Sequence, residues 1–89
     1  MRVFNLRYQE LTSEQVEEAA ESVGLEVFLD GTLTKYPGSL HWHLRKKKGP
    51  GTLEITCWPM SNRLWMQVSG GREAPWIDEV VAQLQQRWE

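Results

Sequence analysis

The chain has 89 residues, of which 40% are hydrophobic and 25% charged, and its formal net charge at pH 7 is −2. A chain of this length can bury one compact core but not a deep cavity, and no apolar run approaches the roughly 18 residues that span a membrane. The single cysteine, Cys57, excludes an internal disulfide and, with an N-terminus unlike a signal peptide, predicts a reducing cytoplasmic location.

The first quarter of the chain predicts one strand and one helix. Residues 2–8 alternate between apolar and polar side chains, which is typical of a strand with one buried face. Residues 11–24 predict a short amphipathic helix, because Thr12 and Gln15 have the spacing of a capping box and Gly24 suits a helix stop. The apolar stripe of this helix comprises Val16, Ala19, Ala20 and Val23.

The next segment predicts a strand followed by irregular chain. Residues 25–29 are apolar and partly β-branched, which favours a second strand. Asp30-Gly31 is a turn signal, so we expect this strand to end there. Residues 31–39 predict no regular element, since Pro37-Gly38 would interrupt one.

Three strands and a helix are predicted for the second half. The strands cover residues 40–45, 52–58 and 63–69, and the sequences KKKGPG and PMSN between them are typical of turns. Residues 74–88 predict a helix, because Pro75 suits its first position and apolar residues recur at helical spacing after it.

These elements predict an α+β fold for residues 1–89 as a single domain, with the order β-α-β-β-β-β-α. Two short helices cannot cover both faces of a sheet. We therefore expect two layers, with a mostly antiparallel sheet that packs both helices on one face and leaves its other face open. The position of the first strand in the sheet is left open.

The alternation in the three later strands predicts which side chains stand on the open face. Turn lengths favour a register in which His43 lies opposite Glu54 and His41 lies opposite Thr56. Across the next turn, the same reasoning pairs Thr56 with Trp65. The candidate binding residues on this face are His41, His43, Arg45, Trp58, Arg63 and Trp65.

The favoured function is a non-catalytic binding or interaction module that acts through this face, with a second copy of the chain or another protein as its partner. Exposed large aromatic residues such as Trp58 and Trp65 tend to mark contact surfaces. Arg63 is expected to stack on Trp58. The alternative is that residues 31–39 fold over the two tryptophans and form a small second core. No cofactor is expected.

A nucleic-acid-binding domain is a second interpretation. Lys46, Lys47 and Lys48 project from a predicted hairpin tip, and Trp58 and Trp65 could offer a stacking platform beside them. A solvated hairpin tip explains the same lysine run without a ligand.

A metal site with hydrolytic activity is the third interpretation. A His-x-His pair on a strand places both imidazoles on one side, and Glu54 opposite His43 could supply a third ligand. The alternative metal-ligand set is therefore His41, His43 and Glu54. The basic run from Arg45 onward weighs against this site because it would oppose a bound cation.

Overall fold

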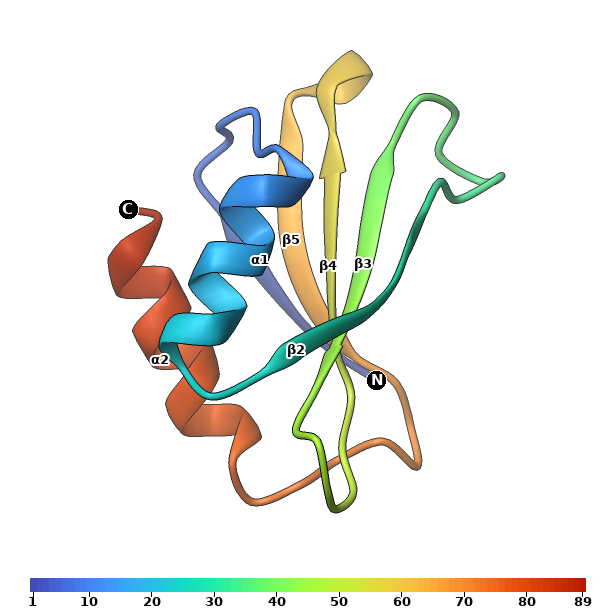
Figure 1. Cartoon of the computed structure of the whole chain (residues 1–89). Coiled ribbons are helices and arrows are strands. Elements are labelled where there is room, and N and C mark those ends of the chain that lie inside the picture. The colour runs from blue at the N-terminus through green and yellow to red at the C-terminus, as the bar shows by residue number, and fades with distance from the viewer.

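The computed structural model describes residues 1–89 as a five-stranded antiparallel sheet and two helices in two layers (Figure 1). The elements are β1 (Arg2–Leu6), α1 (Ser13–Ser22), β2 (Glu26–Gly31), β3 (Leu40–Arg45), β4 (Leu53–Trp58), the short 3-10 helix η1 (Pro59–Ser61), β5 (Arg63–Val68) and α2 (Ile77–Arg87). The α+β class and the element order predicted from the sequence are confirmed.

The strands lie in the order β1-β5-β4-β3-β2, and every neighbouring pair is antiparallel. Strands β2 to β5 form a meander in which consecutive strands pair with each other. Strand β1 pairs with β5, with Arg2 opposite Val68 and Leu6 opposite Leu64. The first strand, whose place the sequence left open, is therefore an edge of the sheet.

Both helices cover the same face of the sheet, which we call the inner face (Figure 1). Trp42, Ile55 and Met66 lie on adjacent strands of this face and are almost completely buried. The helices contribute the buried residues Val16, Ala19, Ala20, Ile77, Val80, Val81 and Leu84. Trp42 also donates a hydrogen bond from Nε1 to Ser13 Oγ at 3.1 Å, which joins β3 to the first turn of α1.

Helix α1 begins with the capping box that the sequence predicts. The Thr12 hydroxyl accepts a hydrogen bond from the backbone N–H of Gln15 at 3.2 Å, and the Gln15 side chain accepts one from the backbone N–H of Thr12 at 2.9 Å. Two backbone donors at the helix start are thereby satisfied.

Three predicted boundaries are wrong. The second helix begins at Ile77 and not at residue 74, so Pro75 lies before the helix and not at its first position. The first strand ends at Leu6 and does not continue to residue 8. The turn predicted at Asp30-Gly31 does not form there, because these residues stay in β2 and pair with Trp42 and His41 of β3. Tertiary strand pairing overrides the local turn preference at this point. The chain reverses only in the segment 32–39, where Gly38 adopts a positive φ of 78°.

No helix of the chain combines the length and the apolar composition needed to cross a membrane.

Candidate functional site

The face of the sheet away from the helices, which we call the outer face, carries the side chains that the alternation predicted. His41 lies opposite Thr56, and Thr56 lies opposite Trp65. In the next row, His43 lies opposite Glu54. The predicted register is confirmed at these positions, because a slip of one residue would have moved these side chains to the inner face.

The expected exposure of this face is wrong at its centre. His41 is only 4% exposed and Trp65 only 3% exposed, although both point away from the helices. The segment 32–39 covers this region: the Tyr36 ring meets the rings of Trp58 and Trp65 edge-on, with centroid distances of 4.8 and 5.1 Å. Of the two arrangements that the sequence left open, the structure has the small second core.

Contacts of the covering segment hold it against the sheet. The indole Nε1 of Trp58 donates a hydrogen bond to the backbone oxygen of Pro37 at 2.9 Å. The buried Ser39 hydroxyl accepts a hydrogen bond from the backbone N–H of Leu33 at 3.1 Å. The cover is therefore fixed by polar contacts as well as by ring packing.

Arg63 and Arg45 remain exposed at two ends of the outer face, and Arg63 has a different partner from the one expected. Arg63 lies over the ring of Trp65 at 4.6 Å, not over Trp58, because Trp65 is its neighbour on the same side of β5. Arg45 pairs with Glu26 at 3.0 Å and lies 4.3 Å from the centre of the Phe28 ring. The charge of Arg45 is thus matched by a carboxylate on β2.

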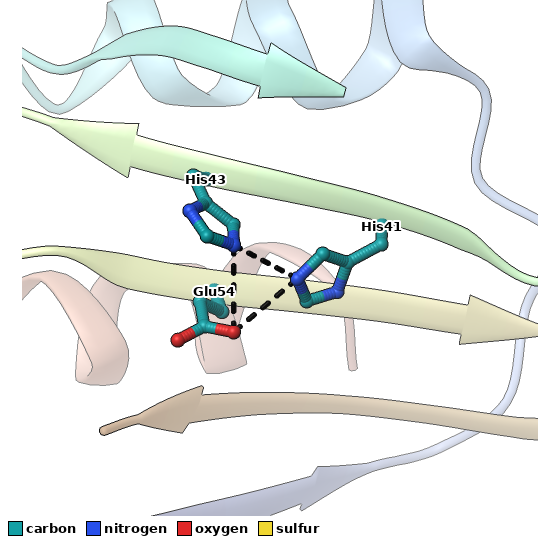
Figure 2. Close-up of side chains that lie close together, drawn as sticks. All are labelled: His41, His43 and Glu54. Carbon is teal, nitrogen blue, oxygen red and sulfur yellow. Dashed lines mark hydrogen bonds and ion pairs between the residues drawn. The ribbon is translucent and has the colours of Figure 1, made fainter. Parts of the chain in front are cut away.

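Three donor atoms meet beside this covered region, in the group His41, His43 and Glu54, which we call the triad (Figure 2). The Nε2 atom of His41 lies 2.9 Å from Nε2 of His43 and 3.2 Å from Oε1 of Glu54. The distance from His43 Nε2 to the same oxygen is 3.5 Å. Figure 2 shows both imidazole rings turned toward the carboxylate across β3 and β4.

The spacing of these atoms resembles one face of a metal coordination tetrahedron. Bonds of 2.0–2.1 Å to zinc imply distances of about 3.3 Å between neighbouring ligand atoms. The three distances in the triad, 2.9, 3.2 and 3.5 Å, lie around this value. The triad could therefore hold one ion with small side-chain movements.

Further side chains hold the triad residues in place. His41 Nδ1 lies 2.7 Å from the Thr56 hydroxyl. The other oxygen of Glu54 accepts a hydrogen bond from Ser69 Oγ at 2.8 Å, and Oε1 accepts one from Gln67 Nε2 at 3.2 Å. Partners of this kind orient the ligands of metal sites.

The Thr56 hydroxyl suits both protonation patterns of His41. In the protein without an ion, Thr56 can donate to Nδ1 while His41 Nε2–H points at His43 Nε2 and the carboxylate of Glu54. With an ion, both Nε2 atoms must be free of protons, and His41 Nδ1–H then donates to the Thr56 oxygen. A hydroxyl can donate or accept, so the contact survives in either state.

The charge of the triad is unusual for a buried site. The Glu54 side chain is only 9% exposed, and its ion-pair partners are the two histidines, with no lysine or arginine among them. Burial lowers the pKa of His41, and the adjacent His43 lowers it further, against an opposing effect of Glu54. A buried carboxylate without a lysine or arginine beside it favours the binding of a positive charge.

Cys57 is absent from this site. It stands on the inner face, is completely buried and lies 3.6 Å from the backbone oxygen of Gln9. Burial raises the pKa of the Cys57 thiol, which keeps it protonated and unreactive at neutral pH.

Sequence reasoning missed several residues that shape the site. Phe28 meets the His43 ring edge-on at 5.6 Å, because an irregularity in β2 between Val27 and Leu29 changes the register with β3. Ser69, directly after the end of β5, reaches Glu54. No pattern in the sequence signals the bulge, whereas the position of Ser69 two residues after Gln67 follows from the alternation of β5.

The three lysines of the predicted hairpin tip lie where expected. Lys46, Lys47 and Lys48 are exposed in the turn between β3 and β4, and none of them forms an ion pair. Trp65 is buried beneath Tyr36 and Trp58 is half-buried against the same ring, so the open pair of tryptophans expected as a stacking platform is not present.

Comparison of the chain with protein-family models, with curated proteins and with solved structures gives no match.

Proposed function

We propose that this chain is a small metal-binding domain in which His41, His43 and Glu54 hold one divalent transition-metal ion. The observation that carries this proposal is the convergence of two imidazole nitrogens and one carboxylate oxygen at separations of 2.9 to 3.5 Å. Two nitrogen ligands and one oxygen ligand suit zinc and other late first-row ions, whereas magnesium and calcium prefer oxygen alone.

Three protein ligands leave one position of a tetrahedral ion for water or a small molecule. A zinc-bound water loses a proton near neutral pH and can then act as a nucleophile. However, the pocket of this chain is lined by residues of the β3–β4 tip and the start of α2, and none of the triad residues borders it. The geometry therefore supports metal binding more strongly than hydrolysis of a large substrate.

The proposal is tested with untagged protein, because an added histidine tag would itself bind metal. The protein is stripped with a chelator, dialysed and titrated with Co²⁺, whose visible absorption reports tetrahedral coordination, and then with competing Zn²⁺. We expect one ion per chain. Glu54→Gln and His43→Gln should each weaken binding by at least about tenfold, because each removes one ligand.

Glu26→Gln is the matched control, since it makes the same chemical change on the neighbouring strand β2, where Glu26 pairs with Arg45. This variant should bind the ion like the unaltered chain. Circular dichroism checks that every variant is folded. Absence of binding by the unaltered chain, or equal binding by all variants, would contradict the proposal.

Self-association is a second candidate function, with another copy of this chain as the partner. Phe28 and Leu29 are adjacent in β2, are 36% and 45% exposed, and flank His43 on the outer face. The expected contact therefore shifts from the covered tryptophans to this edge strand. Light scattering over a range of concentrations tests it: a dimer should dissociate in Phe28→Ser, and a monomer at every concentration would remove the idea.

For location, we propose the reducing cytoplasm. The only cysteine is free and buried, so the fold uses no disulfide. Fractionation of the source cells with an antibody against the chain tests this proposal, and recovery from an oxidising compartment would contradict it.

A further inference from the structure

A shallow pocket lies on another part of the molecule, between the tip of the β3–β4 hairpin and the segment that leads into α2. We call it the tip pocket. It has a volume of about 440 Å³ and is lined by Lys46, Lys48, Gly49, Pro50, Pro75 and Trp76. Figure 1 shows the hairpin tip beside the connection from β5 to α2, which are far apart in the sequence.

The two walls of the tip pocket are joined to each other. Trp76 Nε1 donates a hydrogen bond to the backbone oxygen of Pro50 at 3.0 Å, and the backbone N–H of Thr52 donates one to the backbone oxygen of Arg72 at 3.0 Å. A Cβ atom at Gly51 would lie 2.4 Å from the Cβ of Ala74, so the hairpin tip and the segment before α2 are in close contact there. The pocket is therefore a built feature and not a gap between independent loops.

The charge in the tip pocket is positive and unmatched. Lys46 and Lys48 form no ion pair, and no acidic residue lines the pocket. The acids that flank Trp76 in the sequence, Glu73 and Asp78, are both held by Arg2 at 2.7 and 2.6 Å. Glu73 and Asp78 thus form ion pairs with Arg2 and not with the lysines, and Lys46 and Lys48 remain available to an anion.

The tip pocket combines two ammonium groups with an indole ring. Ammonium groups bind phosphate as point charges, and a tryptophan ring stacks on any nucleobase. Ligand pockets of small molecules usually have volumes of 300–1,000 Å³, a range that includes this one. We propose that the tip pocket binds a nucleotide, with its phosphate at Lys46 and Lys48 and its base against the indole of Trp76.

This proposal does not depend on the triad, which lies on the outer face and shares no residue with the pocket. It also changes the interpretation of the lysine run. The two tryptophans first expected to stack with a nucleic acid contact Tyr36, whereas Trp76 lines the pocket beside the lysines.

The test is a two-dimensional amide NMR titration of metal-free protein at low salt. The probes are adenosine monophosphate, inorganic phosphate, adenosine and a short oligothymidylate. Adenosine monophosphate should shift the amide signals of Gly49 and Gly51 and the indole signal of Trp76, and the shifts should saturate. If the oligonucleotide binds more tightly than adenosine monophosphate, the natural ligand is a single-stranded nucleic acid. If adenosine monophosphate binds more tightly, the natural ligand is a free nucleotide.

The lysine run supplies a matched control within three residues. Lys46→Ser and Lys48→Ser should each weaken binding roughly three- to fivefold, whereas Lys47→Ser should change it less, because Lys47 does not line the pocket. Three results would overturn the proposal: no shifts with any probe, phosphate alone binding as tightly as adenosine monophosphate, or equal weakening by all three lysine variants.

Discussion

The inner and outer faces of one sheet are both largely closed to solvent, but by different means. Trp42, Ile55 and Met66 on the inner face are covered by helices and make almost entirely apolar contacts. The outer face buries His41 and Glu54 beside its aromatic cover and satisfies them with hydrogen bonds. The alternation of side chains along a strand therefore predicts which face of the sheet each side chain lies on. It does not predict which face is exposed to water.

The largest expected effect is the loss of the inner face's biggest side chain. Trp42→Ala should lower the free energy of unfolding by about 3–5 kcal/mol, because it removes a buried ring and leaves a cavity between β3 and α1. Urea unfolding followed by circular dichroism measures this change. A loss below about 1 kcal/mol would show that the inner face is not the main core.

The second-largest expected effect is stabilisation of the fold by an ion bound on the outer face. Zinc at about 100 times its dissociation constant should raise the free energy of unfolding by about 2.7 kcal/mol, provided that it binds only the folded chain. Thermal unfolding with and without the ion measures the shift, and Glu54→Gln should abolish most of it. An unchanged midpoint would leave the outer face a purely hydrogen-bonded layer.

A pair of isosteric exchanges compares the two faces directly. Val68→Thr would place a hydroxyl in the apolar inner core, and Thr56→Val would remove the hydroxyl that contacts His41. Both should destabilise the fold by about 1–3 kcal/mol, for opposite chemical reasons. Chemical unfolding of both variants gives the answer. If Thr56→Val were neutral or stabilising, an apolar side chain would be as favourable on the outer face as it is on the inner face.

The smallest effect is expected from opening the aromatic cover. Tyr36→Ala should cost about 1–2 kcal/mol, because it removes the edge contacts with Trp58 and Trp65. It should also make tryptophan fluorescence more accessible to acrylamide. Tyr36→Phe is the control, since it keeps the ring. Unchanged quenching in the alanine variant would mean that other residues of the segment 32–39 provide the cover.

The regular strands were the predictable part of the structure. Alternation in β3, β4 and β5, together with short turns, was sufficient to pair His43 with Glu54 and Thr56 with Trp65. Residues 32–39 have no such periodicity, so the sequence offered their position over the tryptophans only as one of two alternatives and could not decide between them. Their placement depends on tertiary contacts such as the one between Trp58 and Pro37.

The candidate site was predictable as a set of residues but not as a geometry. The register predicts that His41, His43 and Glu54 are neighbours, whereas the distances between their donor atoms depend on side-chain rotamers that the pattern does not contain. Of the basic run that weighed against a metal ion, Arg45 is matched by Glu26. The tip pocket was not predictable, since Trp76 and Lys46 approach only through the tertiary fold.

The edge position of β1 has a consequence for the order of folding. Strands β2 to β5 join through short local connections, but β1 must wait for β5 because residue 2 pairs with residue 68. Contacts between distant parts of a chain form slowly, so we expect the meander to assemble first and the N-terminal strand to dock last. Pulsed hydrogen exchange during refolding should then show late protection of residues 2–6, and simultaneous protection of all five strands would contradict this order.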